Sequence, residues 1–189
     1  MNNLSAPCAI AVYCGSSAGN NPAFAQAARD IGRLFAQHRI RMIYGGGRVG
    51  LMGILADAAL EHGGAVIGVI PRMLMDRELA HPGLQTLHVT DTMHERKARM
   101  LALSGGCIAL PGGIGTLDEL FEHWTLKHLG ANDAPCALLN IEGYYDPLLQ
   151  FLDRAVSDGL LPHHVRDMLT VDSSAERLLQ RFGYSSRIE

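Results

Sequence analysis

The sequence predicts an α/β protein with a doubly wound, mostly parallel β-sheet. Two observations lead to this prediction. Short apolar runs typical of buried strands alternate with helix-period segments along the chain, and three of these runs end in glycine-rich turns. Alternation of this kind buries a parallel sheet between two layers of helices. The 189 residues suit one domain over 1–189, without repeats or linkers. We therefore expect a single, Rossmann-like domain.

Each helix is predicted from its boundary signals as well as from its period. Pro22 fits the first turn of one helix, His62-Gly63-Gly64 ends the next, and Thr92 with Glu95 forms a capping box. The strands are the apolar runs between such signals. In order, we expect a strand at 8–14, a helix at 22–38, a strand at 41–44, a helix at 50–62, a strand at 65–70, an irregular or briefly helical stretch at 71–82, a strand at 85–89, a helix from 92, a strand at 107–110, a helix from 116, a strand at 135–139, a helix at 145–157, a loop through 162, an edge strand at 168–171 and a helix at 174–182.

The most informative motif is Pro-Gly-Gly-Ile-Gly-Thr-Leu-Asp-Glu over 111–119, which follows the strand-like run at 107–110. A strand, a glycine-rich turn and a helix N-terminus in this order form an anion site, because backbone N–H groups and the positive end of the helix dipole face one concavity. Glycine at Gly112, Gly113 and Gly115 implies either positive φ angles or the close approach of a ligand. The motif therefore predicts a phosphate-binding loop.

Glu119, at the end of this motif, has two interpretations. Thr116 and Glu119 match a capping box, in which Glu119 bonds back to the N-cap amide. A carboxylate beside a phosphate cradle also suits catalysis on a phosphorylated substrate. The glycines favour the catalytic interpretation, because a plain helix start requires none of them.

Two further glycine-rich turns follow the first two predicted strands. Gly45-x-Gly47-x-x-Gly50 matches a dinucleotide fingerprint, yet it follows the second strand, and Ile70-Pro71-Arg72 stands where an acidic residue is expected. We therefore predict a general phosphate or ribose contact and no redox cofactor. Cys14-Gly15-Ser16-Ser17 alone fits a tight turn, but beside the other turns it can form the wall that holds an adenine-type base or its sugar.

The segment 95–99, Glu-Arg-Lys-Ala-Arg, carries the most concentrated positive charge in the chain. A solvated helix face, with Glu95 and Arg99 paired at i,i+4, accounts for Arg99 but not for Arg96. Arg96 lies near the start of its helix, where a cation opposes the helix dipole by about 0.3–1 kcal/mol. An anionic ligand would offset that cost. Lys97 points about 100° away from Arg96 and cannot make an equivalent contact.

Together these motifs resemble the Lonely Guy (LOG) family of cytokinin-activating phosphoribohydrolases. The resemblance is carried by 111–119, by 93–98, by the glycine turns at 14–17 and 44–53, and by 68–71. It implies an enzyme that cleaves the N-glycosidic bond of N6-modified adenosine 5′-monophosphates, with AMP as a further candidate substrate, to free base and ribose 5-phosphate. It also implies a homodimer or larger homo-oligomer, in contact near the helices that begin at Thr92 and Thr116. By resemblance Glu119 and Arg96 are catalytic, and the substrate-binding residues are Gly15, Ser16, Gly46, Gly47, Lys97, Gly112, Gly113, Gly115, Thr116 and Thr125.

Two other functions compete with this one. Family members have often been labelled lysine decarboxylases, but a pyridoxal-phosphate enzyme needs a lysine for its aldimine. Lys97 and Lys127 are the only lysines, and both lie in predicted helices without an evident acidic pyridinium partner. A non-catalytic nucleotide carrier is the second alternative, because a fold does not determine a function. Glu119 with Arg96 favours the enzyme, since a carrier needs no carboxylate near C1′.

Composition narrows the classes of partner. A net charge of −3 disfavours binding to nucleic acid or anionic membranes. The N-terminal segment has neither a basic region nor an apolar run that could span a bilayer, so we expect a cytoplasmic protein. The cysteines are scattered, with Cys8, Cys107 and Cys136 in apolar runs, and the nine histidines show no ligand spacing. We therefore predict neither disulfides nor a metal site, and no cofactor.

Overall fold

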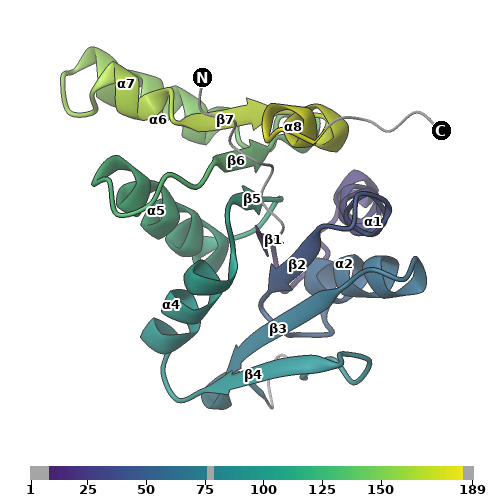
Figure 1. Cartoon of the computed structure of the whole chain (residues 1–189). Helices are drawn as coiled ribbons and strands as arrows, with labels where there is room; N and C mark the ends of the chain where they lie inside the picture. Colours follow the sequence, from purple (N-terminus) through teal and green to yellow (C-terminus); the bar gives the residue numbers. More distant parts are fainter. Residues whose placement is uncertain (1–8, 76–78, 185–189) are drawn as a thin grey trace.

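The computed structural model describes residues 9–75 and 79–184, which form one seven-stranded β-sheet in the order β4-β3-β2-β1-β5-β6-β7 (Figure 1). All six pairings between neighbouring strands are parallel. The predicted parallel sheet is therefore confirmed. The strands are β1 (Ala9–Tyr13), β2 (Arg41–Tyr44), β3 (Val66–Pro71), β4 (Thr86–Thr90), β5 (Cys107–Ala109), β6 (Cys136–Leu139) and β7 (Leu169–Asp172).

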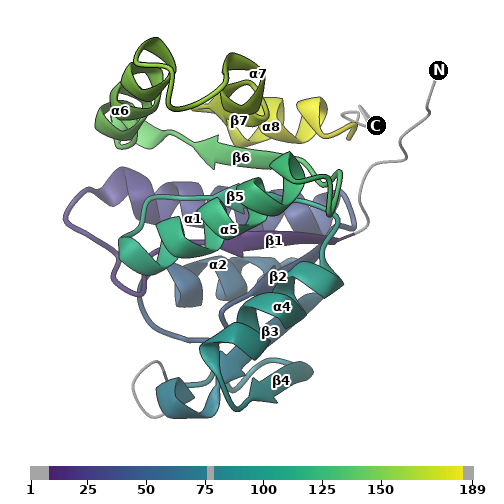
Figure 2. The ribbon, with the colours of Figure 1, turned by 90° about the vertical axis from the view of Figure 1, so that its left-hand side faces the viewer.

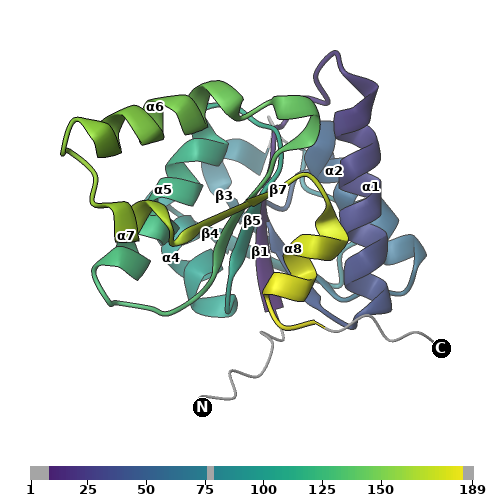
Figure 3. The ribbon, with the colours of Figure 1, turned by 90° about the horizontal axis from the view of Figure 1, so that it is seen from above.

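Helices cover both faces of this sheet. Figure 2 shows α4 and α5 crossing the near face, with α1 and α2 behind the strands, and Figure 3 shows the two layers from above. This three-layer arrangement is the doubly wound architecture that the alternating sequence predicts. One layer contains α1 (Pro22–Gln37), α2 (Gly50–Glu61) and α8 (Ala175–Arg181), and the other contains α4 (Met93–Leu103), α5 (Ile114–His128), α6 (Asp146–Ser157) and α7 (His163–Arg166).

β1 contributes to the hydrophobic core on both faces of the sheet. Ile10 and Val12 pack in the cluster that includes α1 and α2, whereas Ala9, Ala11 and Tyr13 pack in the cluster that includes α4 and α5. All five side chains are buried. A strand that is buried on both faces is apolar throughout, which is why 9–13 show no polar alternation.

The sheet extends from the central strand β1 in two directions. β2, β3 and β4 follow on one side of β1, and β5, β6 and β7 lie on the other. The chain turns from β1 to α1 on one face and from β5 to α5 on the other, so a crevice opens between the two loops. Ligands of open α/β sheets bind at such a switch point. The two loops meet there, because the Gly15 N–H donates to the Pro111 carbonyl at 3.1 Å.

The predicted elements are confirmed in order, with two corrections of detail. The helix expected from Thr116 begins at Ile114, and the single-turn helix α7 lies in the segment after Pro162, where no helix is predicted. The predicted start is too late because Thr116 with Glu119 resembles a capping box and because glycine, as at Gly113 and Gly115, disfavours a helix. Cys8 and residues 76–78, for which a strand and an irregular stretch are predicted, lie outside the described residues. Among the described helices, none combines the length and the apolar character needed to cross a membrane.

The close packing of α1 on α2 depends on Gly32. A Cβ atom at Gly32 would lie 2.6 Å from the Leu55 carbonyl oxygen and 2.9 Å from the Ala58 Cβ. Gly32→Ala gains about 1 kcal/mol of helix propensity but forces the two helices apart. We expect a net loss of about 1–3 kcal/mol in the free energy of unfolding, measured by urea denaturation. Arg29→Ala, at an exposed position of α1, is the control. Unchanged stability of Gly32→Ala would contradict the close contact.

Candidate active site

A pocket of about 240 Å³ opens where the loops after β1 and β5 meet. Its walls come from β1 and the following loop, from the end of β2 and the start of α2, and from the first turns of α4 and α5. The pocket therefore lies at the switch point of the sheet. Its lining residues are Val12, Cys14, Gly15, Ser16, Gly45, Met52, Met93, Arg96, Gly113, Ile114, Gly115, Thr116 and Glu119.

The N-terminus of α5 faces this pocket without a side-chain cap. The Leu117 N–H donates to the Gly113 carbonyl at 3.1 Å, which is the first hydrogen bond of the helix. The amides of residues 114–116 therefore have no partner within α5. The helix dipole adds partial positive charge at the same end. This combination suits a phosphate group, as the motif predicts.

Backbone strain does not explain the glycines of the loop. None of Gly112, Gly113 and Gly115 has a positive φ, so that interpretation of the motif is wrong. Gly112 is required by packing, because a Cβ atom there would lie 2.1 Å from the Thr116 Oγ1. A Cβ atom at Gly113 or Gly115 would meet no described atom within 4 Å. The close approach of a ligand is the interpretation that remains for these two glycines.

Arg96 presents a fixed positive charge to the pocket. Its guanidinium is buried, its Nε donates to the Val69 carbonyl at 3.1 Å, and its Nη1 lies 3.6 Å from the Glu119 Oε1. A Cβ atom on Gly45 would lie 2.3 Å from Nη2, so glycine at this position leaves room for the guanidinium. A buried charge needs such partners, because its desolvation is otherwise uncompensated.

Glu119 is not part of a capping box. The N-cap of α5 is Gly113, so Thr116 is the third residue of the helix and Glu119 the sixth. The Thr116 side chain is buried against Gly112. Glu119 instead lies at the pocket wall beside Arg96, with 11% of its side chain exposed. The two predicted catalytic residues therefore form one ion pair inside the pocket.

The structure gathers most of the predicted site residues and separates the others. Gly112 lies directly behind the pocket wall. Gly46, with a φ of 79°, packs toward Ile70 and Leu87, and Gly47 pairs with Ala80 in an isolated antiparallel bridge. At that turn Gly45 lines the pocket instead. The predicted residues that do line it are Gly15, Ser16, Arg96, Gly113, Gly115, Thr116 and Glu119.

Lys97 and Thr125 do not line this pocket. The Lys97 Nζ lies 3.1 Å from the Asp118 Oδ2 and 3.3 Å from the Glu122 Oε2. Burial alone would lower the pKa of Lys97, but the hydrogen bond with Asp118 and the charge of Glu122 raise it above its ordinary value. Thr125 is exposed farther along α5. For both residues, a substrate contact rests on the family resemblance alone.

Two tyrosines that sequence reasoning missed hold the glycine-rich loop between β5 and α5 from behind. The Tyr144 hydroxyl donates to the Gly112 carbonyl at 2.7 Å, and the Tyr145 hydroxyl donates to the Leu110 carbonyl at 2.6 Å. Burial and the neighbouring Tyr144 raise the pKa of Tyr145, so its hydroxyl stays protonated. Both residues follow β6, at the carboxyl edge of the sheet, and that position is the signal that could have found them.

The pocket also has an apolar side that the motifs did not predict. Val12, Met52, Met93 and Ile114 contribute to it. Apolar side chains with a few convergent polar groups are typical of small-molecule sites, and they suit the faces of a planar base. Met93 could have been found from its spacing, because a residue three positions before Arg96 lies on the same helix face.

Comparison with known proteins assigns the family in two steps. A family model described as "Possible lysine decarboxylase" matches residues 52–182, so the chain belongs to that family. A cytokinin riboside 5′-monophosphate phosphoribohydrolase of Rhodococcoides fascians is 45% identical over 171 residues, which cover 90% of this chain and 86% of that protein. A protein of the same name from Arabidopsis thaliana is 44% identical over 172 residues, with 91% and 81% covered. The chain is therefore a member of the cytokinin riboside 5′-monophosphate phosphoribohydrolase family, as the resemblance predicts.

Solved structures with the same fold come from more distant proteins. The molybdenum cofactor binding protein of the phototrophic bacterium Rippkaea orientalis has a TM-score of 0.69 at 22% identity, with 93% of this chain and 94% of that chain covered. The molybdenum cofactor carrier protein of Chlamydomonas reinhardtii has a TM-score of 0.68 at 20% identity, with 93% and 95% covered. At these identities the likeness establishes the Rossmann-like fold alone.

Gly115→Ala tests the anion site directly. The new methyl group meets no described atom and removes a helical glycine, so the melting temperature should stay equal or rise. The same methyl group stands at the pocket wall, so we expect binding of inorganic phosphate to weaken by roughly 10-fold, as about 1.4 kcal/mol of lost contact implies. Calorimetric titration measures the affinity. Gly112→Ala is the contrasting variant, because its clash with Thr116 should lower stability. Unchanged phosphate affinity in Gly115→Ala would argue against a ligand at this helix start.

Proposed function

We propose that this protein is a phosphoribohydrolase that cleaves the N-glycosidic bond of N6-modified adenosine 5′-monophosphates, the cytokinin nucleotides. AMP is a further candidate substrate. The observation that carries the proposal is the Arg96–Glu119 pair in the same pocket as the uncapped N-terminus of α5. The names of the relatives supply the substrate class. The products are the free base and ribose 5-phosphate.

In the proposed reaction, the bond between C1′ and the base nitrogen breaks. Water adds its oxygen to C1′, and one water proton replaces C1′ on the departing base. Positive charge develops on the ribose during this step, and a carboxylate stabilises it. Glu119 takes that role and also holds ribose hydroxyls or orients the water.

The α5 amides and Arg96 serve the phosphate end of the substrate. The amides of residues 114–116 hold the 5′-phosphate. Arg96, fixed by Val69 and Glu119, either shares the phosphate or polarises the transition state. Binding at the phosphate, remote from C1′, contributes to turnover because it orients the reacting carbon.

Lysine decarboxylase chemistry does not fit the two lysines. Attack on an aldehyde requires a neutral amine, whereas the raised pKa of Lys97 keeps its ammonium charged at neutral pH. The Lys127 Nζ donates to the Asp133 carbonyl at 2.9 Å. Neither lysine lines the pocket. The description of the family model is therefore not a guide to the activity of this chain.

A non-catalytic nucleotide carrier is the second candidate. The fold is compatible with it, and the α5 amides would serve a carrier equally well. Glu119 distinguishes the two functions, because a carboxylate beside a bound anion weakens binding. A carrier would gain affinity by losing this charge, whereas the enzyme would lose its turnover.

We also propose a cytoplasmic homodimer or larger homo-oligomer, with its contact on α4 and α5. Ile114 and Leu129, at the two ends of α5, are 90% and 69% exposed. A second subunit that packs along α5 would cover both side chains, and two-fold dimers are the commonest soluble oligomers. Lys97 and Thr125 lie on the same two helices. In a dimer, Lys97 and Thr125 would contact the substrate bound to the neighbouring subunit. This contact would explain why the family resemblance assigns them to substrate binding although they do not line the pocket of their own subunit.

Glu119→Gln tests the catalytic assignment. The neutral amide cannot stabilise a developing cation, so release of free base from N6-isopentenyl-AMP should fall by about 100-fold or more. Since Glu119 is the partner of the buried Arg96, the free energy of unfolding should also fall by about 1–3 kcal/mol. Glu122→Gln, on the same helix and paired with Lys97, is the matched control. Chromatography of the released base measures turnover. Near-normal turnover in Glu119→Gln would contradict the assignment of Glu119 as the catalytic carboxylate.

Cleavage should require the 5′-monophosphate. An uncharged nucleoside lacks the charge-assisted hydrogen bonds to the α5 amides and Arg96, at about 1.5–3 kcal/mol each, so kcat/KM should fall by about 100-fold or more. Arg96→Ala should reduce the difference in kcat/KM between the nucleotide and the nucleoside. Arg99→Ala, at an exposed position of the same helix, should leave that difference unchanged. Equal kcat/KM for isopentenyladenosine and its monophosphate would refute phosphate recognition by this loop.

Light scattering at micromolar concentration tests the assembly. We expect at least twice the chain mass of 20.4 kDa. Leu129→Glu places a charge in the proposed contact and should shift the mass toward that of one chain. Leu160→Glu, at an 84% exposed leucine outside α4 and α5, should leave the mass unchanged. A parent protein of one-chain mass would contradict the proposal.

A further inference from the structure

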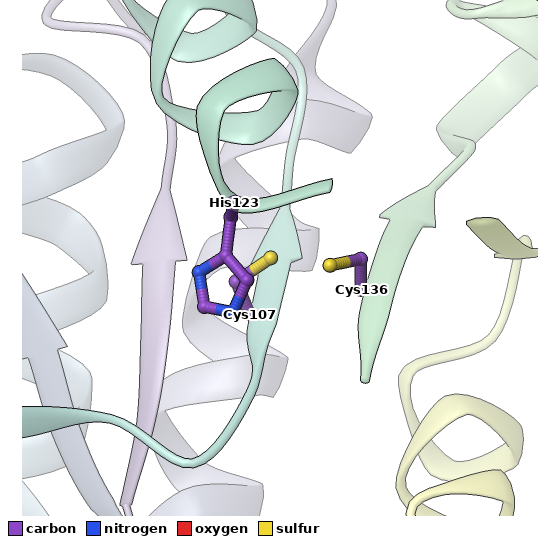
Figure 4. A group of neighbouring side chains, drawn as sticks. All are labelled: Cys107, His123 and Cys136. Atoms are coloured by element: carbon purple, nitrogen blue, oxygen red, sulfur yellow. The ribbon is translucent and has the colours of Figure 1, made fainter. Parts of the chain in front are cut away.

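Cys107, His123 and Cys136 form a buried cluster that does not line the pocket (Figure 4). Cys107 and Cys136 are direct partners in the pairing of β5 with β6, so both side chains project to the same face of the sheet. His123 reaches that face from α5. Their potential ligand atoms all lie within 4.8 Å of one another. The sequence did not reveal the cluster, because its members come from three elements and share no short spacing.

His123 has a polar atom that ordinary core packing does not explain. The residue is 1% exposed, and its Nε2 has no hydrogen-bond partner among the described residues. Its Nδ1 lies 3.4 Å from the Tyr13 hydroxyl oxygen. Metal-binding histidines are held in this way, with one ring nitrogen on an outer partner and the other on the metal. Buried polar atoms without a partner are uncommon in folded proteins.

The chemistry of the three side chains suits a metal ion. A neutral imidazole is the form that binds metals, and thiols bind them with loss of their protons.

We propose that Cys107, His123 and Cys136 bind a soft divalent metal ion of the Zn²⁺ class. Thiolate and imidazole are the ligands that zinc takes in proteins, whereas Mg²⁺ and Ca²⁺ take oxygen ligands. Two thiolates cancel the charge of a divalent ion, so the buried unit is neutral. A monovalent ion would leave a net negative charge in the core, which is costly. Binding displaces the two thiol protons to solvent.

The geometry fits such an ion after a small movement. Ligand atoms at about 2.0–2.3 Å from a tetrahedral zinc lie about 3.3–3.8 Å apart. The three atoms already lie within 4.8 Å of one another. Side-chain rotations that move each atom by about 1 Å bring them to the distances of a common ion. The cluster supplies three of the four ligands that a tetrahedral zinc ion takes.

The bound ion would tie α5 to the centre of the sheet. His123 lies four residues after Glu119, one helical turn away on the same side of α5. Cys107 and Cys136 belong to strands that precede the phosphate-binding loop and the two supporting tyrosines. In this proposal the ion holds in place the helix that carries Glu119.

Metal content and a Co²⁺ spectrum test the site without using activity. The protein is purified under a phosphine reductant, stripped with a chelator, and titrated with Zn²⁺ or Co²⁺. We expect one Zn²⁺ per chain by mass spectrometry of the metal, and a thiolate-to-cobalt charge-transfer band with Co²⁺. Zn²⁺ at about 100-fold over its Kd should raise the melting temperature by roughly 5–10 °C.

Variants locate the ion. Cys136→Ala and Cys107→Ala replace small buried groups by small apolar ones, and each should abolish the Co²⁺ charge-transfer band or reduce it severely. His123→Leu should lower the affinity for Zn²⁺ by at least 10-fold, the scale of losses seen even for outer partners of a metal. Cys14→Ala is the matched control and should bind metal like the parent protein. A parent protein that takes up neither ion overturns the proposal, as does full uptake by Cys136→Ala.

Discussion

A buried guanidinium sets the requirements that the rest of the pocket meets. Arg96 lies inside the protein, where an uncompensated charge would be unstable. Its partners come from different parts of the fold: the Val69 carbonyl within β3, the Glu119 carboxylate on α5, and the space left by Gly45 after β2. These features belong to two neighbouring strands of one parallel sheet and to a helix that packs on it. The position of one side chain thus depends on the register of several strands.

The central strand β1 allows that edge to become a pocket. Because the chain leaves β1 and β5 toward opposite faces, the loops after these strands border a crevice above the sheet, and the N-terminus of α5 faces that crevice. The hydrogen bond from Gly15 to Pro111 and the two tyrosine hydroxyls fix the loops around it. The loops that line the pocket are therefore rich in glycine but are held by hydrogen bonds to ordered neighbours. Such support lets a loop position a binding site precisely.

The sequence predicts the three layers, the order of helices and strands along the chain, and most of the charged and glycine residues that line the pocket. These features depend on local signals. Apolar runs, Pro22, His62-Gly63-Gly64 and the capping residue Thr92 act within a few residues of one another. The features that could not be predicted from the sequence depend on contacts between distant segments. The start of α5 was misplaced because a local pattern, Thr116 with Glu119, resembles a cap, and the Cys107–His123–Cys136 cluster was missed because strand register brings it together.

The ion pair of Arg96 and Glu119 also gives the proposed reaction its electrostatic logic. Before substrate binds, the two charges compensate each other in the pocket wall. A phosphate at the α5 amides draws on the helix dipole and on Arg96, while the Glu119 carboxylate opposes it. When positive charge develops at C1′, that opposition becomes attraction. An interaction that is unfavourable in the bound ground state and favourable in the transition state lowers the barrier, which a uniformly attractive pocket would not do. The Glu119 carboxylate thus compensates the buried charge of Arg96 before the substrate binds, and in the proposed reaction it also stabilises the charge that develops at C1′.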